Sequence, residues 1–174
     1  GEDDVRPAGK AAIGYKSTNF HGLGTDYPAI KDIMKYVIDT GKSQVKDKSK
    51  IGENFYLRGV FNSILTAEAI KTAQGKYGKK IITGEEMRWG MENMNLTSER
   101  LAEIGLPGFT NPISLSCDDH ANNGPVYIQQ WNGNSWERVS GWISSMDRVR
   151  PMLEKAAAEY KAKNNLSDRT IPCS

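Results

Sequence analysis

The chain has 174 residues, of which 38% are apolar and 25% are charged, and its formal net charge is +2. This composition is typical of a globular domain with its own core. Its lysines are interspersed with acids, which argues against nucleic acid as a partner, because such partners need a concentrated basic face. The one basic cluster, 42–50, is diluted by Asp47 and two serines and predicts a solvated loop. No apolar run reaches the roughly 18 residues needed to span a bilayer.

The first residues of the chain and its two cysteines bear on whether the protein is exported from the cytoplasm. The chain starts with GEDDV, without an initiator methionine and without a charged and then apolar leader, which we interpret as a processed or truncated start. Two cysteines, Cys117 and Cys173, permit one disulfide in an exported protein, and two buried thiols are the alternative. Two histidines, His21 and His120, are too few for a multi-histidine metal site. We therefore expect no metal and no cofactor.

Hydrophobic periodicity predicts mainly helices in the first two thirds of the chain. Residues 11–18 alternate like a short strand, and a glycine-rich loop follows. Apolar residues at helical spacing then predict four helices. These cover residues 28–41, 54–74, 84–94 and 97–104. Thr83 and Glu86 form a capping box at the start of the third helix.

The last third of the chain predicts strands and one helix. Residues 113–117 alternate like a strand, and turn-forming residues follow them. Two strand-like runs flank Asn132-Gly133, which is the clearest hairpin signal in the chain. An alanine-rich helix is predicted over residues 151–163. Helices with so few strands indicate an α/β or α+β fold whose sheet lacks a partner segment.

Possible catalytic groups have simpler structural interpretations. The segment Cys117-Asp118-Asp119-His120 suggests a nucleophile pair or a cation site, but adjacent carboxylates raise the pKa of a thiol, so a capped turn is favoured. The acidic pairs at 2–4 and 85–86 fit helix-dipole partners better than glycosidase acids. Three tryptophans, at 131, 136 and 142, could stack on a sugar or a base, but packing at the hairpin is favoured. Binding is therefore favoured over catalysis, by elimination.

Four segments, read in order, resemble one known family. They are AGKAAIGYKSTNFH, YLRGVFNSILTAEAIKTAQ, GEEMRWGMENMNLT and SCDDHANNGPVYIQQWNGNSWERVSGWI. Together they are similar to extracellular solute-binding proteins of the leucine/isoleucine/valine-binding type. No single motif is diagnostic, and the order and spacing of all four carry the resemblance. It covers nearly all of this chain but under half of a family chain, at the C-terminal end.

The resemblance implies the type I periplasmic-binding fold, in which two α/β lobes with Rossmann-like layers close on a ligand like a hinge. Only the C-terminal portion of that fold is expected here. Residues 1–18 correspond to the end of the second lobe, and residues 19–117 to the tail of the first. Residues 118–174 correspond to a hinge crossing and a return to the second lobe.

The same resemblance implies a function and a site. It implies periplasmic binding of an amino acid, amide or aromatic acid for uptake by an ABC transporter, without enzyme activity. The implied partners are the solute, the membrane permease and the missing N-terminal half of the protein. An aromatic ligand contact at the start of the long helix maps to Phe55 or Tyr56, with core packing as the alternative. The family's acidic partner for the ligand ammonium maps just upstream of Gly1.

Two other functions remain open at this point. One is the ligand-sensing ectodomain of a receptor or regulator with the same fold. The other is a hydrolase or transferase on an unrelated α/β fold, which would need a nucleophile, a base and an orienting group. Export also leads us to predict that Cys117 and Cys173 form a disulfide.

Overall fold

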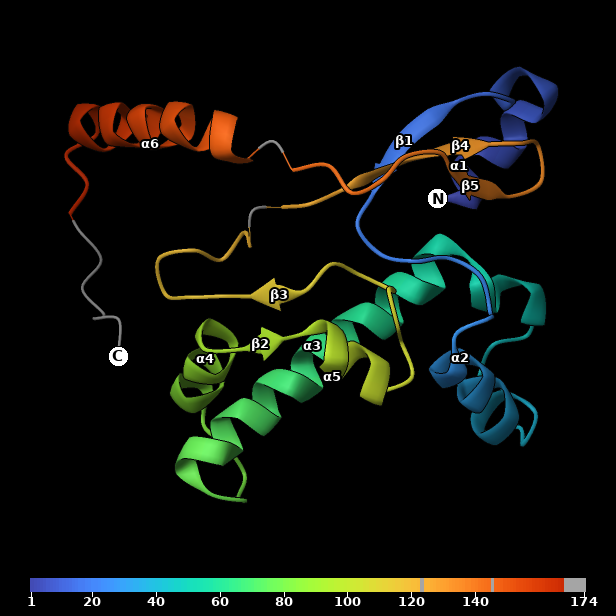
Figure 1. Cartoon of the computed structure of the whole chain (residues 1–174), viewed down its shortest axis with the longest axis horizontal. Coiled ribbons are helices and arrows are strands. Elements are labelled where there is room, and N and C mark those ends of the chain that lie inside the picture. Colours follow the sequence, from blue (N-terminus) through green and yellow to red (C-terminus); the bar gives the residue numbers. More distant parts are fainter. Residues whose placement is uncertain (123, 145, 168–174) are drawn as a thin grey trace.

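The computed structural model describes residues 1–122, 124–144 and 146–167. Most of them form two groups of elements, a small sheet with the N-terminal helices and a larger group built around one long helix (Figure 1). We call these the sheet group and the helical group. The chain leaves the sheet group after its first strand, builds the helical group, and then returns. Segments far apart in the sequence therefore meet where the two groups touch.

The sheet group contains an antiparallel sheet of strand order β1-β4-β5. Its elements are α1 (Glu2–Val5), the 3-10 helix η1 (Arg6–Ala12), β1 (Lys16–Asn19), β4 (Tyr127–Trp131) and β5 (Trp136–Arg138). β1 pairs with β4 so that Lys16 lies opposite Gln130. The side chains of Val5 and Ala12 pack with two hairpin tryptophans to form a small core. The N-terminal helices thus cover the sheet through apolar contacts.

The predicted hairpin is confirmed, whereas the predicted first strand is only partly correct. Asn132 Oδ1 accepts hydrogen bonds from the backbone N–H groups of Asn134 and Ser135, both at 2.9 Å, and fixes the turn. The strand expected over residues 11–18 begins only at Lys16, because η1 continues to Ala12. A strand cannot start earlier because the chain turns at Gly14, whose φ is +88°.

The helical group is organised around α3. It comprises α2 (Pro28–Ile33), its continuation as the π-helix η2 (Met34–Ile38), the 3-10 helix η3 (Lys48–Gly52), α3 (Asn54–Tyr77), α4 (Gly84–Glu92), α5 (Ser98–Glu103) and the two-stranded pair β2 (Asn95–Leu96) and β3 (Ile113–Ser114). Buried Leu57 and Phe61 of α3 pack with Phe109 and other apolar side chains to form the main core. The helices predicted around 28–41, 54–74, 84–94 and 97–104 are confirmed.

The predicted capping box is also present at the start of α4. The Thr83 hydroxyl accepts from the Glu86 N–H at 3.3 Å, and the Thr83 N–H donates to the Glu86 carboxylate at 2.9 Å. Hydrogen bonds from Lys80 and from the Thr83 backbone lower the pKa of Glu86 below its usual range. The negative charge therefore stays at the positive end of the helix.

The last helix buries none of its residues, although Arg150 within it forms an ion pair with Asp119 at 2.9 Å. α6 (Met146–Lys163) begins five residues before the predicted start, so Pro151 lies inside the helix instead of at its beginning. None of its residues is buried, and Met152, Leu153 and Tyr160 are more than half exposed. Figure 1 shows α6 extending away from both groups. These three apolar side chains are thus left largely uncovered by the described part of the chain.

Within the described ranges, no helix combines the length and the apolar character needed to cross a membrane.

The predicted disulfide involves Cys173, which lies outside the described residues, so the pairing stays a prediction. If it forms, the unreduced denatured protein should show no reactive thiol. Reduction should lower the free energy of unfolding by about 4 to 5 kcal/mol, because the bridge closes a long loop in the unfolded chain. Thiol titration under denaturing conditions measures the first quantity, and two titratable thiols would contradict the pairing.

Candidate functional site

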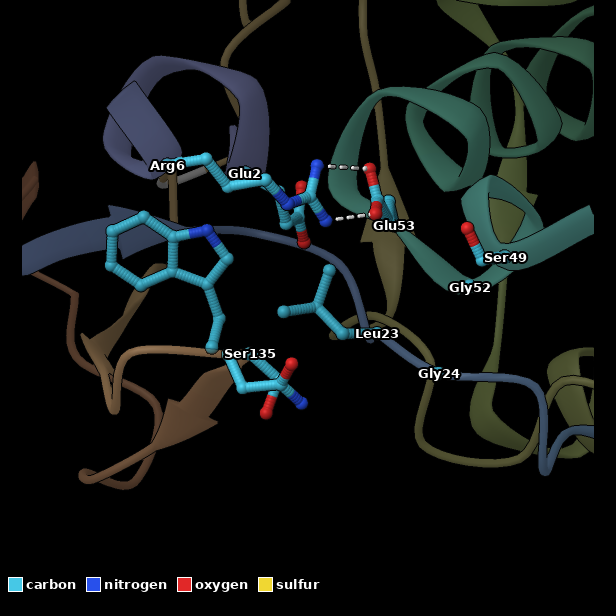
Figure 2. Close-up of a pocket in the computed structure, with 10 residues that line it drawn as sticks. Glu2, Arg6, Leu23, Gly24, Ser49, Gly52, Glu53 and Ser135 are labelled. Carbon is cyan, nitrogen blue, oxygen red and sulfur yellow. Dashed lines mark hydrogen bonds and ion pairs between the residues drawn. The ribbon is translucent and has the colours of Figure 1, made fainter. Parts of the chain in front are cut away.

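A cavity of about 530 Å³ lies where the sheet group meets the start of α3 (Figure 2). Its walls come from four parts of the chain: the N-terminal helices, the loop after β1, the segment from η3 to the start of α3, and the β4–β5 hairpin. The lining residues are Glu2, Arg6, Leu23, Gly24, Ser49, Gly52, Glu53, Asn134, Ser135 and Trp136. The volume is typical of a small-molecule pocket, and most of the lining side chains are polar. The cavity is therefore suited to a small polar solute.

Glu2 is a buried carboxylate in this cavity. Its side chain is only 5% exposed, and both oxygens accept from the backbone N–H of Asn54, at 3.2 and 3.0 Å. Asn54 begins α3, whose N-terminus attracts negative charge. Within the described residues, no lysine, arginine or histidine forms an ion pair with Glu2. A buried carboxylate without a cation is costly, so a cationic group entering the cavity would be stabilised there.

A ring of two acidic and two basic side chains connects the sheet group to the helical group beside the cavity. Arg6 forms a two-point ion pair with Glu53 and a second ion pair with Asp3 at 2.6 Å (Figure 2). Lys50 completes the ring with Asp3 at 2.6 Å and Glu53 at 3.3 Å. The hydrogen bonds from Lys50 and Arg6 lower the pKa of Asp3. Since Asp3 and Arg6 belong to the sheet group, the ring fixes one cavity wall against the other.

The segment that leaves β1 is held by a buried histidine. The His21 ring is fully buried, its Nδ1 lies 2.9 Å from the Gly22 carbonyl oxygen, and its Nε2 accepts from Arg58 Nε at 2.9 Å. Tyr127 donates its hydroxyl to the His21 carbonyl oxygen at 2.6 Å. Burial, with a smaller contribution from the charge of Arg58, lowers the pKa of His21 to about 4. The ring is therefore neutral at pH 7, with Nδ1 protonated and Nε2 acting as the acceptor.

The two residues predicted to contact a ligand do not line this cavity. Phe55 is 59% exposed, and its ring lies against Gly1. Tyr56 lines a different, shallow groove between α2 and α3 with Ile33 and Val60. Successive residues of a helix point about 100° apart, so these two rings face different sides of α3. A ligand contact for either residue stays a prediction.

The Cys-Asp-Asp-His segment forms a capped turn, as predicted. Asp119 Oδ1 accepts from the N–H groups of Ala121 and Asn122, at 2.9 and 3.2 Å, and these bonds help to lower the pKa of Asp119. His120 Nε2 lies 3.4 Å from a carboxylate oxygen of Glu92. Across the described ranges, no three or more His, Cys, Asp or Glu side chains gather as metal ligands would.

Sequence reasoning missed most of this site. It treated the acids at 2–4 as partners of their own helix dipole, whereas Glu2 caps α3 instead. It singled out neither Arg6 nor Glu53. The one local signal is that Glu2 and Arg6 stand four residues apart, on one face of a helical turn. Nothing in the sequence indicates that η3 and the hairpin would meet them.

Two solved structures are similar to this chain. One is a crystal structure described as an ABC transporter permease from the Pseudomonas fluorescens group, with a TM-score of 0.88 and 39% identity, which matches over 98% of this chain and 41% of that one. The other is a branched chain amino acid ABC transporter from Thermus thermophilus with bound valine. Its TM-score is 0.65 and its identity 18%, over 88% of this chain and 39% of that one. Both neighbours are ABC transporter components.

These matches establish the fold. The chain is α/β and has the type I periplasmic-binding fold of the Thermus thermophilus protein, as the family resemblance implied. It spans about two fifths of the length of each matched structure. No family model and no curated protein sequence matches the chain significantly. The division into lobes at residues 18 and 117 stays a prediction.

Proposed function

We propose that this protein binds a small solute with an ammonium group, most simply an amino acid, for uptake by an ABC transporter. The observation that carries the proposal is the buried Glu2 carboxylate, which lines a cavity of suitable size and has no cationic partner among the described residues. A ligand ammonium would supply the missing charge. A charge-assisted hydrogen bond of this kind contributes about 1.5 to 3 kcal/mol.

The similar structures support the transport context. Both are described as ABC transporter components, and the Thermus thermophilus protein contains bound valine, an amino acid. In the proposed role the protein works outside the cytoplasm, in the periplasm, delivers its solute to a membrane permease and catalyses no reaction.

Glutamine at position 2 tests the ammonium partner. Glu2→Gln keeps an oxygen that can accept from the Asn54 N–H but removes the negative charge. We expect the full-length protein to bind at least one amino acid in a calorimetric screen of amino acids, amides and aromatic acids. The substitution should weaken that binding by roughly 10- to 100-fold, the loss of one charge-assisted hydrogen bond.

Asp4→Asn is the matched control, because Asp4 is on the same helix but exposed and outside the cavity. It should leave the affinity unchanged. Equal affinities for the wild-type protein and Glu2→Gln would exclude Glu2 as the ammonium partner. A solute without a cationic group that binds more tightly than every amino acid would contradict the proposed ligand class.

A further inference from the structure

The indole of Trp136 has an unused hydrogen-bond donor and lines the cavity between the sheet group and the start of α3, which we call the junction cavity. Trp136 lines the cavity and is only 8% exposed. Its Nε1–H has no hydrogen-bond partner within the part of the chain that the structure describes. An indole N–H can only donate, and leaving a buried donor without an acceptor is destabilising. The Trp136 N–H therefore lacks an acceptor in the described protein, and a ligand oxygen could supply one.

Aromatic packing fixes the orientation of this ring. The Trp131 ring meets it edge to face with centroids 5.4 Å apart, and the Tyr15 ring lies 6.1 Å away on a tilted plane. Trp136 is also the first residue of β5, and its backbone lies opposite that of Trp131 across the hairpin. Because the indole is clamped in this way, its donor is held in one direction before any ligand arrives, which lowers the cost of binding.

We propose that Trp136 is a ligand-binding residue that donates its Nε1–H to an oxygen of the solute in the junction cavity. This inference rests on the proposed function and deepens it. Within the cavity, Arg6 is already paired with Glu53, whereas Glu2 has no cation and the Trp136 N–H has no acceptor among the described residues. A solute that satisfies both carries an ammonium group and an acceptor oxygen.

The acceptor oxygen can belong to the α-carboxylate or to a polar side chain, and one pair of probes separates the two. Leucine and asparagine have nearly the same shape, but only asparagine has a side-chain oxygen. We expect Trp136→Phe in the full-length protein to weaken calorimetric binding by about tenfold, the contribution of one hydrogen bond. If Trp136→Phe weakens the binding of both amino acids, the acceptor is the α-carboxylate. If it weakens the binding of asparagine alone, the acceptor is the side-chain amide oxygen. Unchanged affinity for both overturns the proposal.

Two further variants separate the donor from the shape of the ring. Replacing the indole of Trp136 by its benzothiophene isostere removes only the N–H, and it should reproduce the loss seen with Trp136→Phe. Trp142→Phe is the matched control, because Trp142 meets the Tyr127 ring edge to face outside this cavity, and it should leave binding unchanged. A loss with Trp136→Phe but not with the isostere would assign the effect to packing and overturn the proposal.

The two proposals fail in different ways. If wild-type protein binds an amino acid and Glu2→Gln weakens it while both Trp136 variants bind normally, the assignment of Trp136 is wrong and the proposed function stands. If wild-type protein binds neither leucine nor asparagine nor any other amino acid, the proposed function is contradicted, and the role of Trp136 is contradicted with it.

Discussion

Replacing Gly90 with alanine is expected to lower the free energy of unfolding by about 2 to 3 kcal/mol, because it overpacks the contact between α3 and α4. A methyl group at this position would lie 2.3 Å from the Ala69 carbonyl oxygen and 3.0 Å from Ala73 Cβ. Both neighbours are on α3, and a backbone carbonyl cannot move aside as a flexible side chain can. The two helices must therefore separate. Urea unfolding at pH 7 measures the effect.

Gly59→Ala is the matched control for that experiment. Gly59 lies within α3, and no described atom outside its own helix lies within 4 Å of a methyl group placed there. Alanine is a better helix former than glycine by about 0.8 to 1 kcal/mol, so this variant should be slightly more stable than the wild type. If Gly90→Ala behaved like Gly59→Ala, the close approach of α3 and α4 would be refuted.

The protein is expected to lose about 2 kcal/mol of stability through His21 alone as the pH falls from 7 to 4.5. The pKa of His21 is lowered to about 4 in the folded protein, against about 6.5 in an unfolded chain. Between these values the unfolded state binds a proton that the folded state does not, so acidification favours unfolding. The contribution of His21 to stability is fully present above about pH 6.5 and is lost as the pH falls toward 4.

His21→Gln should remove this part of the pH dependence, because glutamine offers an acceptor to Arg58 and a donor to Gly22 without titrating. Urea unfolding of both proteins at pH 7 and pH 4.5 gives the difference, and carboxylates common to both proteins cancel. Identical pH dependence in wild type and His21→Gln would show that His21 is not buried as a neutral acceptor.

Local patterns predicted the elements well where a single mechanism determines them. The spacing of Leu57 and Phe61 follows one helical face, and the structure buries both side chains along α3. The Thr83 capping box and the Asn132-Gly133 turn depend on hydrogen bonds within a few residues, so they could be read directly from the sequence. The first strand was placed too early because alternation at residues 11–15 hides a 3-10 helix and a glycine turn.

The site could not be predicted in the same way, because contacts over long sequence distances create it. Glu2 approaches Asn54 only because the N-terminal helices fold back on the start of α3, and Trp136 joins them through the returning hairpin. The role of Trp136 depends on an unpaired N–H, which no sequence pattern reveals. Resemblance to a family indicated the fold and a binding function, but it directed attention to Phe55 and Tyr56, which lie outside the cavity.

The most direct test of the account is a crystal structure of the full-length protein grown with the amino acid that binds most tightly in the calorimetric screen. We expect the amino acid to occupy the junction cavity, with its ammonium group within hydrogen-bond distance of the Glu2 carboxylate and an oxygen facing Trp136 Nε1. An amino acid bound elsewhere in the protein, with the Glu2 side chain still held only by the Asn54 N–H, would contradict the proposed site.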